Sequence, residues 1–193
     1  GGSVRCVEGA VPRVIGTTMY LASPYGAVIA LDATTGAEQW RFEIPDNAVP
    51  SKRGLAYWPG DGDLPPSLLF GASSGGLYSI KASDGTLNAG FGANGVVNLK
   101  TPEVMRNFTD AGYLLLSSPS IYKNLVITGA GTGEGRAFPK GTGPSGDTRA
   151  WDTRTGELVW TFETVPGPDD FGYDSWAGDS ARDRSGVNVW GYM

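Results

Sequence analysis

Short apolar runs separated by clusters of glycine, proline and small polar residues recur along the chain. Near its start, two apolar runs at residues 14–21 and 27–31 flank a Ser-Pro-Tyr-Gly turn, and a third run at residues 38–42 follows a Thr-Gly pair. Runs of this length between turn residues predict β-strands. The pattern therefore predicts a sheet of short antiparallel strands at the start of the chain.

The same pattern returns twice further along. Further strands are expected within residues 68–72, 77–80, 120–128, 148–152 and 158–162, with a turn at residues 122–124. Repeated sets of short strands, several tens of residues apart, are typical of β-propellers. We therefore predict an all-β fold in which residues 1–193 form a partial β-propeller. Its three blades are expected at about residues 10–45, 66–90 and 117–163.

A repeated sequence frame supports this prediction. Residues 30–40 and 150–160 share the frame A-x-D-x-x-T-G-x-x-x-W, and residues 79–89 keep its turn but lack the aspartate and the tryptophan. The frame predicts two strands joined by a tight turn at Thr-Gly, where glycine can adopt a positive φ. One such hairpin is expected in each blade, with Trp40 and Trp160 as packing residues.

The amino-acid composition limits the fold classes and the kinds of catalysis that are open to this chain. Among 193 residues, 30 glycines and 13 prolines disfavour long helices, and no apolar run is long enough to cross a bilayer. The net charge of −5, without a basic stripe, leads us to expect no nucleic-acid partner. The chain has no histidine, which excludes Ser-His-Asp and Cys-His catalysis within it, and its lone Cys6 cannot form an internal disulfide. Any chemistry must therefore use carboxylates, arginine or a bound cofactor.

Three long insertions, at residues 45–66, 88–114 and 164–193, interrupt the strand pattern. Loops held by a rigid scaffold often carry functional residues. The last insertion contains five aspartates together with several aromatic residues, a composition unlike that of a disordered linker. We expect it to be a long loop that leads into the next blade. Because three blades cannot close a propeller, the chain is expected to be a fragment of a longer protein.

The repeated frame resembles the tryptophan-docking motif of the quinoprotein dehydrogenases, enzymes that use pyrroloquinoline quinone (PQQ). Three further segments resemble this family: R-G-L-A-Y-W from Arg53, G-A-G-T-G-E at residues 129–134, and N-V-W-G at residues 188–191. Together with the frame they cover nearly the whole chain. The resemblance implies an eight-bladed propeller, of which about three blades from the N-terminal half are present here.

The resemblance implies that Glu134 ligates Ca²⁺, which in turn holds the quinone. Small neighbours around Glu134 allow backbone and carboxylate to approach a ligand closely. The alternative is a solvated loop glutamate. A dinucleotide-binding loop is disfavoured, because Glu134 stands where the third glycine of G-x-G-x-x-G would be and no helix is expected after it.

Further cofactor contacts are implied by the same resemblance. Arg53 would meet the carboxylates of the quinone through paired hydrogen bonds, and Trp190 would form the floor on which its rings stack. The alternatives are a surface arginine whose stem lies on aromatic residues and a tryptophan that only packs. The remaining cofactor-binding residues implied are Gly131, Thr132, Gly133, Asn188 and Gly191.

Two features bear on which group of this family the chain resembles most. Residues 46–51 lack the adjacent cysteine pair of methanol-oxidising members, and F-G-x-N-G-x-V at residues 91–97 resembles the membrane glucose dehydrogenase group. The catalytic aspartate and the metal-binding asparagine of the family are expected beyond Met193. No catalytic residue is therefore assigned within the chain.

The resemblance implies a PQQ- and Ca²⁺-dependent dehydrogenase that oxidises a glucose-like sugar or an alcohol and passes electrons to ubiquinone or cytochrome c. It also implies a bacterial periplasmic location, with any attachment to the inner membrane made by regions outside this chain. The alternative from another functional class is a non-catalytic propeller of the same repeats that acts as an assembly or binding scaffold.

Overall fold

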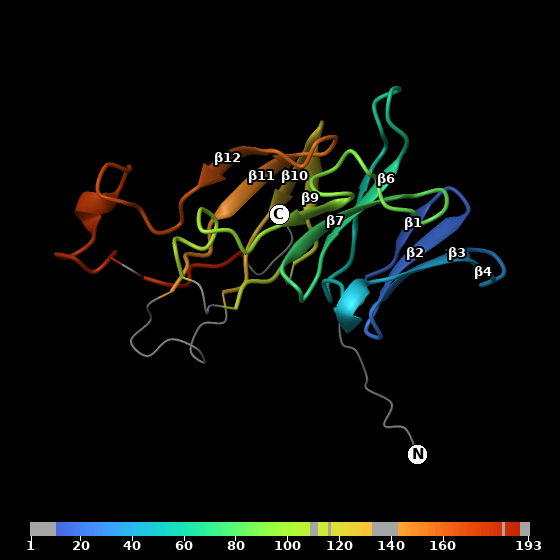
Figure 1. Cartoon of the computed structure of the whole chain (residues 1–193), viewed down its shortest axis with the longest axis horizontal. Helices are drawn as coiled ribbons and strands as arrows, with labels where there is room; N and C mark the ends of the chain where they lie inside the picture. Colours follow the sequence, from blue (N-terminus) through green and yellow to red (C-terminus); the bar gives the residue numbers. More distant parts are fainter. Residues whose placement is uncertain (1–10, 109–111, 116, 133–142, 183, 190–193) are drawn as a thin grey trace, which may run out of the picture.

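The described residues of the computed structural model form three four-stranded antiparallel sheets (Figure 1). The structure describes residues 11–108, 112–115, 117–132, 143–182 and 184–189. The first sheet consists of β1 (Arg13–Ile15), β2 (Thr18–Ser23), β3 (Ala27–Asp32) and β4 (Glu38–Glu43). The second consists of β5 (Ala56–Trp58), β6 (Ser67–Gly71), β7 (Gly76–Lys81) and β8 (Val96–Asn98). The third consists of β9 (Ser120–Tyr122), β10 (Leu125–Thr128), β11 (Thr148–Asp152) and β12 (Leu158–Phe162).

In each sheet every strand pairs with the next one along the chain, which is the arrangement of a propeller blade. The prediction of an all-β propeller is thereby confirmed. The helical elements among the described residues are two single 3-10 turns, η1 (Pro45–Asn47) and η3 (Tyr173–Ser175). No helix in the described ranges has the length and apolar character needed to cross a membrane.

The second blade is wider than the expected range of residues 66–90. Its first and last strands, β5 and β8, lie in the insertions that were expected at residues 45–66 and 88–114. Both strands have only three residues. Three residues are too few to show the alternation that identifies a strand, so these two strands depend on pairing with β6 and β7.

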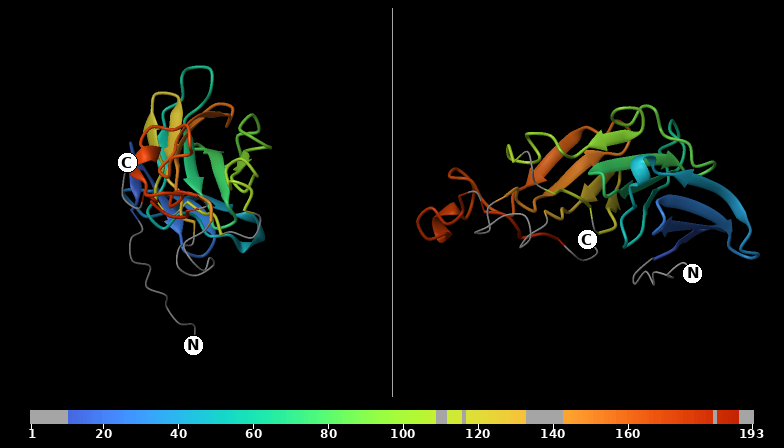
Figure 2. Two further views of the ribbon diagram at one scale, coloured as in Figure 1. Left: turned by 90° about the vertical axis from the view of Figure 1, so that its left-hand side faces the viewer. Right: turned by 60° about the horizontal axis from the view of Figure 1, so that its bottom comes forward.

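The three sheets lie side by side, with the second between the other two (Figures 1 and 2). One apolar cluster, which includes Val28 and Phe70, joins the first and second blades, and another, which includes Leu69 and Val126, joins the second and third. As a result all five residues of β6 are buried. The first strands of the second and third blades, β5 and β9, contact each other, as expected where blades converge.

The aspartate of the repeated frame builds its turn. Asp32 Oδ1 accepts hydrogen bonds from the backbone N–H groups of Thr34 and Thr35 at 2.9 and 2.7 Å. Asp152 Oδ1 does the same for the two residues that follow it in the third blade. In both hairpins the strand register shifts next to the alanine of the frame. The frame thus encodes one local structure in both blades.

The tryptophan of the frame locks one blade to the next. The indole of Trp40, in β4, lies over Gly85 in the turn of the second blade, and its Nε1 donates to the carbonyl oxygen of Ala82 at 3.2 Å. Gly85 has a φ of +72°, and a Cβ added there would lie 2.6 Å from the indole. Glycine is therefore required both by the turn and by the docked ring.

The junction between the second and third blades is built differently, because the second copy of the frame has Ala89 in place of the tryptophan. Gly156 is the third-blade equivalent of Gly85. The backbone N–H of Gly92 donates to Thr155 O at 2.8 Å, and a Cβ on Gly156 would lie 2.6 Å from Val97. A loop of the second blade, residues 88–97, thus covers the glycine that a tryptophan covers at the first junction.

Candidate functional site

The segment that follows β10 is held by the loop that precedes β9. Leu114 N donates to Gly131 O at 3.0 Å, and Gly131 N donates to Leu114 O at 2.7 Å. Gly131, one of the predicted cofactor-binding residues, therefore has both backbone groups engaged by the protein itself. This pairing fixes the start of the glycine-rich stretch.

Two of the predicted cofactor-binding residues are brought together by the fold. Thr132 is fully buried, and its hydroxyl lies 3.5 Å from the amide oxygen of the partly exposed Asn188. These residues are 56 positions apart in the chain. Their side chains thus form a polar contact between the segment that follows β10 and residues 186–189.

Two glycines allow this close approach. An added Cβ on Gly146 would overlap the amide oxygen of Asn188 and lie 2.8 Å from its Cα. An added Cβ on Gly129 would lie 2.9 Å from the Cβ of Val189. Any side chain at either position would push residues 188–189 away from the third blade.

Hydrogen bonds hold residues 186–189 at both ends of the segment. Gly146 N donates to Gly186 O at 2.9 Å, and the Ser117 hydroxyl donates to Val189 O at 3.2 Å. Val187, between them, has a φ of +58°, which is strained for a β-branched residue. Strained backbone of this kind is concentrated at binding and catalytic sites.

A buried hydroxyl beside this segment lacks a partner. Ser145 is fully buried, and among the described residues its Oγ has no hydrogen-bond partner. A buried polar atom without a partner is costly and needs an explanation, such as a bound ligand. Ser145 directly precedes Gly146, and Asn188 packs against Gly146.

Arg53 lies in the turn before β5, in the second blade. It is half-buried, and its guanidinium forms no hydrogen bond or ion pair within the described part of the chain. Ser51 N in the same turn donates to Gly71 O at 2.8 Å, and Leu115 packs directly on Gly71. Arg53 is thus linked to the Leu114–Gly131 pairing through the end of β6. No hydrogen bond among the described residues joins it to Thr132 or Asn188.

A buried ion-pair network supports these segments from behind. Asp147 and Arg149 are 1% and 3% exposed and pair at 2.8 Å. Arg149 also donates to the hydroxyl of Tyr113 at 3.0 Å. Asp147 follows Gly146 and Tyr113 precedes Leu114, so the network fixes both sides of the site. Burial raises the pKa of Tyr113, although the charge of Arg149 opposes the rise.

Arg106 extends the network toward the surface. It lies 3.5 Å from Asp147 and donates to Glu163 at 2.9 Å. Burial raises the pKa of Glu163, and its hydrogen bond with Asp170 adds to the rise, while Arg106 opposes it. The network therefore continues into the loop after β12.

This network was not predicted from the sequence. The available signal was a pair of opposite charges two residues apart, Asp147 and Arg149, just before the apolar Ala150 and Trp151. Charged residues are almost never fully buried unless they are paired, so a charge inside a predicted strand with an opposite charge two residues before it is a signal for an ion pair.

The other predicted site residues, Gly133, Glu134, Trp190 and Gly191, lie outside the described residues. Within the described ranges no three acidic, cysteine or histidine side chains gather as a metal site would require. Metal binding through Glu134 therefore stays a prediction.

Comparisons with known proteins give one consistent result. The family described as "Glucose/ethanol/alcohol dehydrogenase, beta-propeller domain", short name PQQ, matches residues 3–193. Quinate/shikimate dehydrogenase (quinone) of Acinetobacter baylyi is 27% identical over 94% of this chain and 24% of its own length. Quinoprotein glucose dehydrogenase of Escherichia coli is 30% identical, with coverages of 82% and 21%.

Two further similarities extend this result. The alcohol dehydrogenase (quinone) dehydrogenase subunit of Gluconacetobacter polyoxogenes is 31% identical over 81% of this chain and 20% of its own. The crystal structure of quinohemoprotein alcohol dehydrogenase from Comamonas testosteroni matches with a TM-score of 0.62 and 26% identity, over 86% of this chain and 22% of that one. The chain thus spans 20–24% of the length of these curated relatives.

Proposed function

Because the chain belongs to the PQQ family of glucose, ethanol and alcohol dehydrogenase β-propellers, we propose that the full-length protein oxidises a sugar or alcohol with bound PQQ and Ca²⁺. The observation that carries this proposal is the proximity of Thr132 and Asn188 at one end of the third blade, near the buried Ser145, whose hydroxyl has no hydrogen-bond partner within the described ranges. The described relatives include glucose, alcohol and quinate dehydrogenases.

The residues around this point fit such a cofactor. PQQ is flat and carries carboxylates, so it needs hydrogen-bond donors at its rim and little side-chain bulk around it. Thr132 and Asn188 offer polar groups, and Gly129 and Gly146 add no side-chain bulk where residues 188–189 approach. Arg53 offers a guanidinium without a partner among the described residues, and its planar shape suits paired hydrogen bonds to a carboxylate.

We assign the residues of this chain to binding rather than to proton transfer. When bound, PQQ supplies the two-electron acceptor and Ca²⁺ supplies a Lewis acid. Arg53 would hold the carboxylates, Glu134 would ligate the metal, and Trp190 with Gly191 would lie against the rings. Gly131, Thr132, Gly133 and Asn188 would line the rim. The catalytic base is expected outside this chain.

Substrate, electron acceptor and location belong to the same proposal. We favour a glucose-like sugar because residues 91–97 resemble the membrane glucose dehydrogenase group. Electrons would pass to ubiquinone or cytochrome c, and the protein would act in the periplasm.

A test on the full-length protein separates the dehydrogenase from a non-catalytic scaffold. PQQ binding is measured by spectroscopic titration in the presence of Ca²⁺, and activity by dye reduction with glucose, ethanol and quinate. Arg53→Met is expected to weaken PQQ binding at least about tenfold, because a charge-assisted pair of hydrogen bonds is lost. Arg41→Met, which removes an exposed arginine paired with Glu38, is the matched control and should bind PQQ as the wild type does.

Glu134→Gln tests the metal site. It is expected to raise the Ca²⁺ concentration needed for PQQ binding, because a neutral amide replaces a charged metal ligand. A full-length protein that neither binds PQQ nor reduces dye would contradict the proposal and favour the scaffold.

A further inference from the structure

Arg149 is a buried arginine that joins segments distant in the sequence. It lies in β11, directly opposite Thr128 at the end of β10. Its Nη1 donates to the hydroxyl of Tyr113 at 3.0 Å, and its Nη2 donates to the Asp147 carboxylate at 2.8 Å and to the carbonyl oxygen of Val104 at 3.4 Å. The residue is 3% exposed, and hydrogen bonds to a charged group are strong where water is excluded. Arg149 therefore fixes these three partners relative to β11.

One series of contacts leads from Arg149 to Thr132. Tyr113, which is 1% exposed, directly precedes Leu114, and Leu114 exchanges two backbone hydrogen bonds with Gly131 at 3.0 and 2.7 Å. Thr132 follows Gly131 in the chain. A shift of the Tyr113 ring would therefore move Thr132 through this pair of hydrogen bonds.

A second series of contacts leads from Arg149 to Asn188. Asp147 directly follows Gly146, against which Asn188 packs. The other carboxylate oxygen of Asp147 accepts a hydrogen bond from the backbone N–H of Thr164 at 3.1 Å, at the start of the loop that leads to Asn188. Arg149 therefore holds Asn188 both through β11 and through the beginning of this loop.

The two series end at the same place, because the Thr132 hydroxyl lies 3.5 Å from the amide oxygen of Asn188. We propose that Arg149 is a positioning residue for PQQ, which sets the distance between Thr132 and Asn188 at the cofactor rim. Its own guanidinium is buried and bonded to protein groups, so it acts through these residues and does not touch the cofactor. The assignment to PQQ rests on the proposed function, whereas the positioning itself applies equally to the protein without PQQ.

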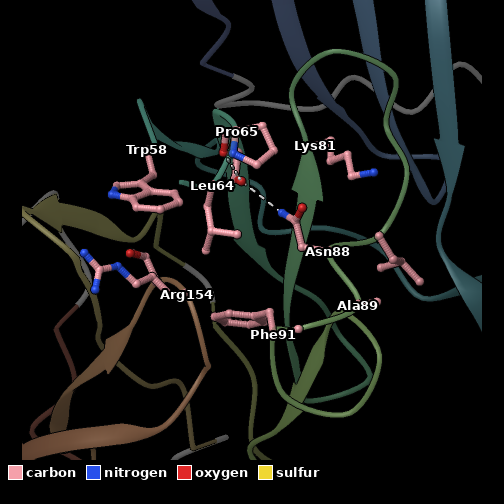
Figure 3. A pocket seen from close by; sticks show the side chains of 12 residues that line it. Trp58, Leu64, Pro65, Lys81, Asn88, Ala89, Phe91 and Arg154 are labelled. Carbon is pink, nitrogen blue, oxygen red and sulfur yellow. Dashed lines mark hydrogen bonds between the residues drawn. The ribbon is translucent and has the colours of Figure 1, made fainter. Parts of the chain in front are cut away.

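Another arginine joins the second and third blades without reaching this contact. Arg154 pairs with Asp61 beside a groove of about 270 Å³ whose walls include Trp58 and Phe91 (Figure 3). The other side-chain and capping hydrogen bonds of this pair, among the described residues, lie within three residues of them along the chain. Loss of the Arg154–Asp61 pair should therefore leave the contact at the rim unchanged.

The first test uses the full-length protein without PQQ. Tyr113→Phe removes the hydroxyl that Arg149 holds and keeps the ring in the core. Hydrogen exchange, followed by mass spectrometry, is expected to become at least about tenfold faster in peptides that cover residues 129–132 and 186–189, because a buried hydrogen bond to a charged group is lost. Tyr20→Phe is the matched control, since it removes a buried hydroxyl bond at the first blade junction, and it should leave these peptides unchanged.

The second test titrates the same variants with PQQ in the presence of Ca²⁺. Tyr113→Phe is expected to weaken PQQ binding at least about fivefold, because small displacements of binding groups are costly. Tyr20→Phe and Arg154→Met should bind PQQ as the wild type does. Gly146→Ala displaces Asn188 by a separate route, so in that background Tyr113→Phe should change the affinity by less than about twofold.

Arg149→Lys tests the central residue directly. It keeps a positive charge beside Asp147 but replaces the fork of donors by a single ammonium, so it should give the same exchange pattern as Tyr113→Phe. Unchanged exchange of residues 129–132 in both variants would overturn the positioning role. So would a loss of PQQ affinity from Tyr113→Phe that is as large with Gly146→Ala as without it.

Failure of the proposed function would be seen separately. A wild type that binds no PQQ would refute that function and, with it, the assignment of the rim to PQQ. Faster exchange in Tyr113→Phe would still support Arg149 as the group that holds Thr132 and Asn188 together.

Discussion

Three equivalent glycines give a direct measure of how tightly the blades are joined. Gly36, Gly85 and Gly156 occupy the same turn of the frame, with φ values of +75°, +72° and +75°. Nothing lies within 4 Å of a Cβ added to Gly36, whereas the other two face the neighbouring blade. Replacement of each glycine by alanine therefore applies the same backbone strain with different contacts.

The magnitudes follow from these contacts. Alanine with positive φ costs about 1–2 kcal/mol, and this is the whole effect expected for Gly36→Ala. In Gly85→Ala the Cβ would lie 2.6 Å from the Trp40 indole, and overpacking of this kind adds about 1–3 kcal/mol. In Gly156→Ala it would lie 2.9 Å from the backbone nitrogen of Gly92, so a similar addition is expected.

Urea denaturation of the full-length protein measures the free energy of unfolding of each variant. The Gly85 and Gly156 variants should each fall below Gly36→Ala by about 1–3 kcal/mol. In a Trp40→Ala background the extra cost of Gly85→Ala should vanish, because the indole it strikes is gone. Equal losses in all three variants, within about 0.5 kcal/mol, would refute the view that the tryptophan and the loop lock the blades.

Three further predictions concern the site and the turns. Gly146→Ala is expected to displace Asn188 and lower the affinity of the full-length protein for PQQ at least about tenfold in a binding titration; unchanged affinity would show that the Asn188 side chain is not a ligand. Asp147→Ala is expected to lower the free energy of unfolding by about 3–5 kcal/mol, because it leaves a buried arginine without its carboxylate, and a loss below about 1 kcal/mol in urea would contradict this. Hydrogen bonds from Thr35, first from its backbone N–H, hold the pKa of Asp32 below its ordinary value of 3.8. The stability that the Asp32 carboxylate provides is therefore fully present above pH 3.8 and is lost as the pH falls through the lower pKa of the folded state. The difference in stability between wild type and Asp32→Ala should therefore shrink from pH 7 to about pH 3, and a constant difference would count against the turn as its cause.

The parts of the fold that were predictable from sequence are those encoded locally. The frame at residues 30–40 and 150–160 predicts two strands joined by a Thr-Gly turn with glycine at positive φ, and both hairpins form as predicted. The hydrogen bonds by which the aspartate caps each turn are seen only in the structure. The strands β5 and β8 were missed because three residues carry no periodic signal and depend on their partners. Likewise, Ala89 showed that a docking tryptophan was absent, but only the structure shows that residues 88–97 replace it.

The residues of the candidate site likewise fall into those that sequence motifs identified and those that were missed. Thr132 and Asn188 were named through motifs, and the structure brings them together although they are 56 residues apart. The Asp147–Arg149 pair and its link to Tyr113 were missed, because a buried ion pair is defined by burial and distance rather than by a sequence motif. The opposite charges are visible in the sequence, but their burial and pairing are seen only in the structure.

The direction of docking has a consequence for synthesis on the ribosome. Trp40 closes on Gly85, and Gly92 closes on Thr155 and Gly156, so each junction is made by an earlier blade on a later one. At about 5–20 residues per second, every finished blade waits several seconds with its locking group exposed. Assembly is therefore vectorial, and a pause in translation after the first blade would leave the Trp40 indole open to chaperones or to a neighbouring nascent chain.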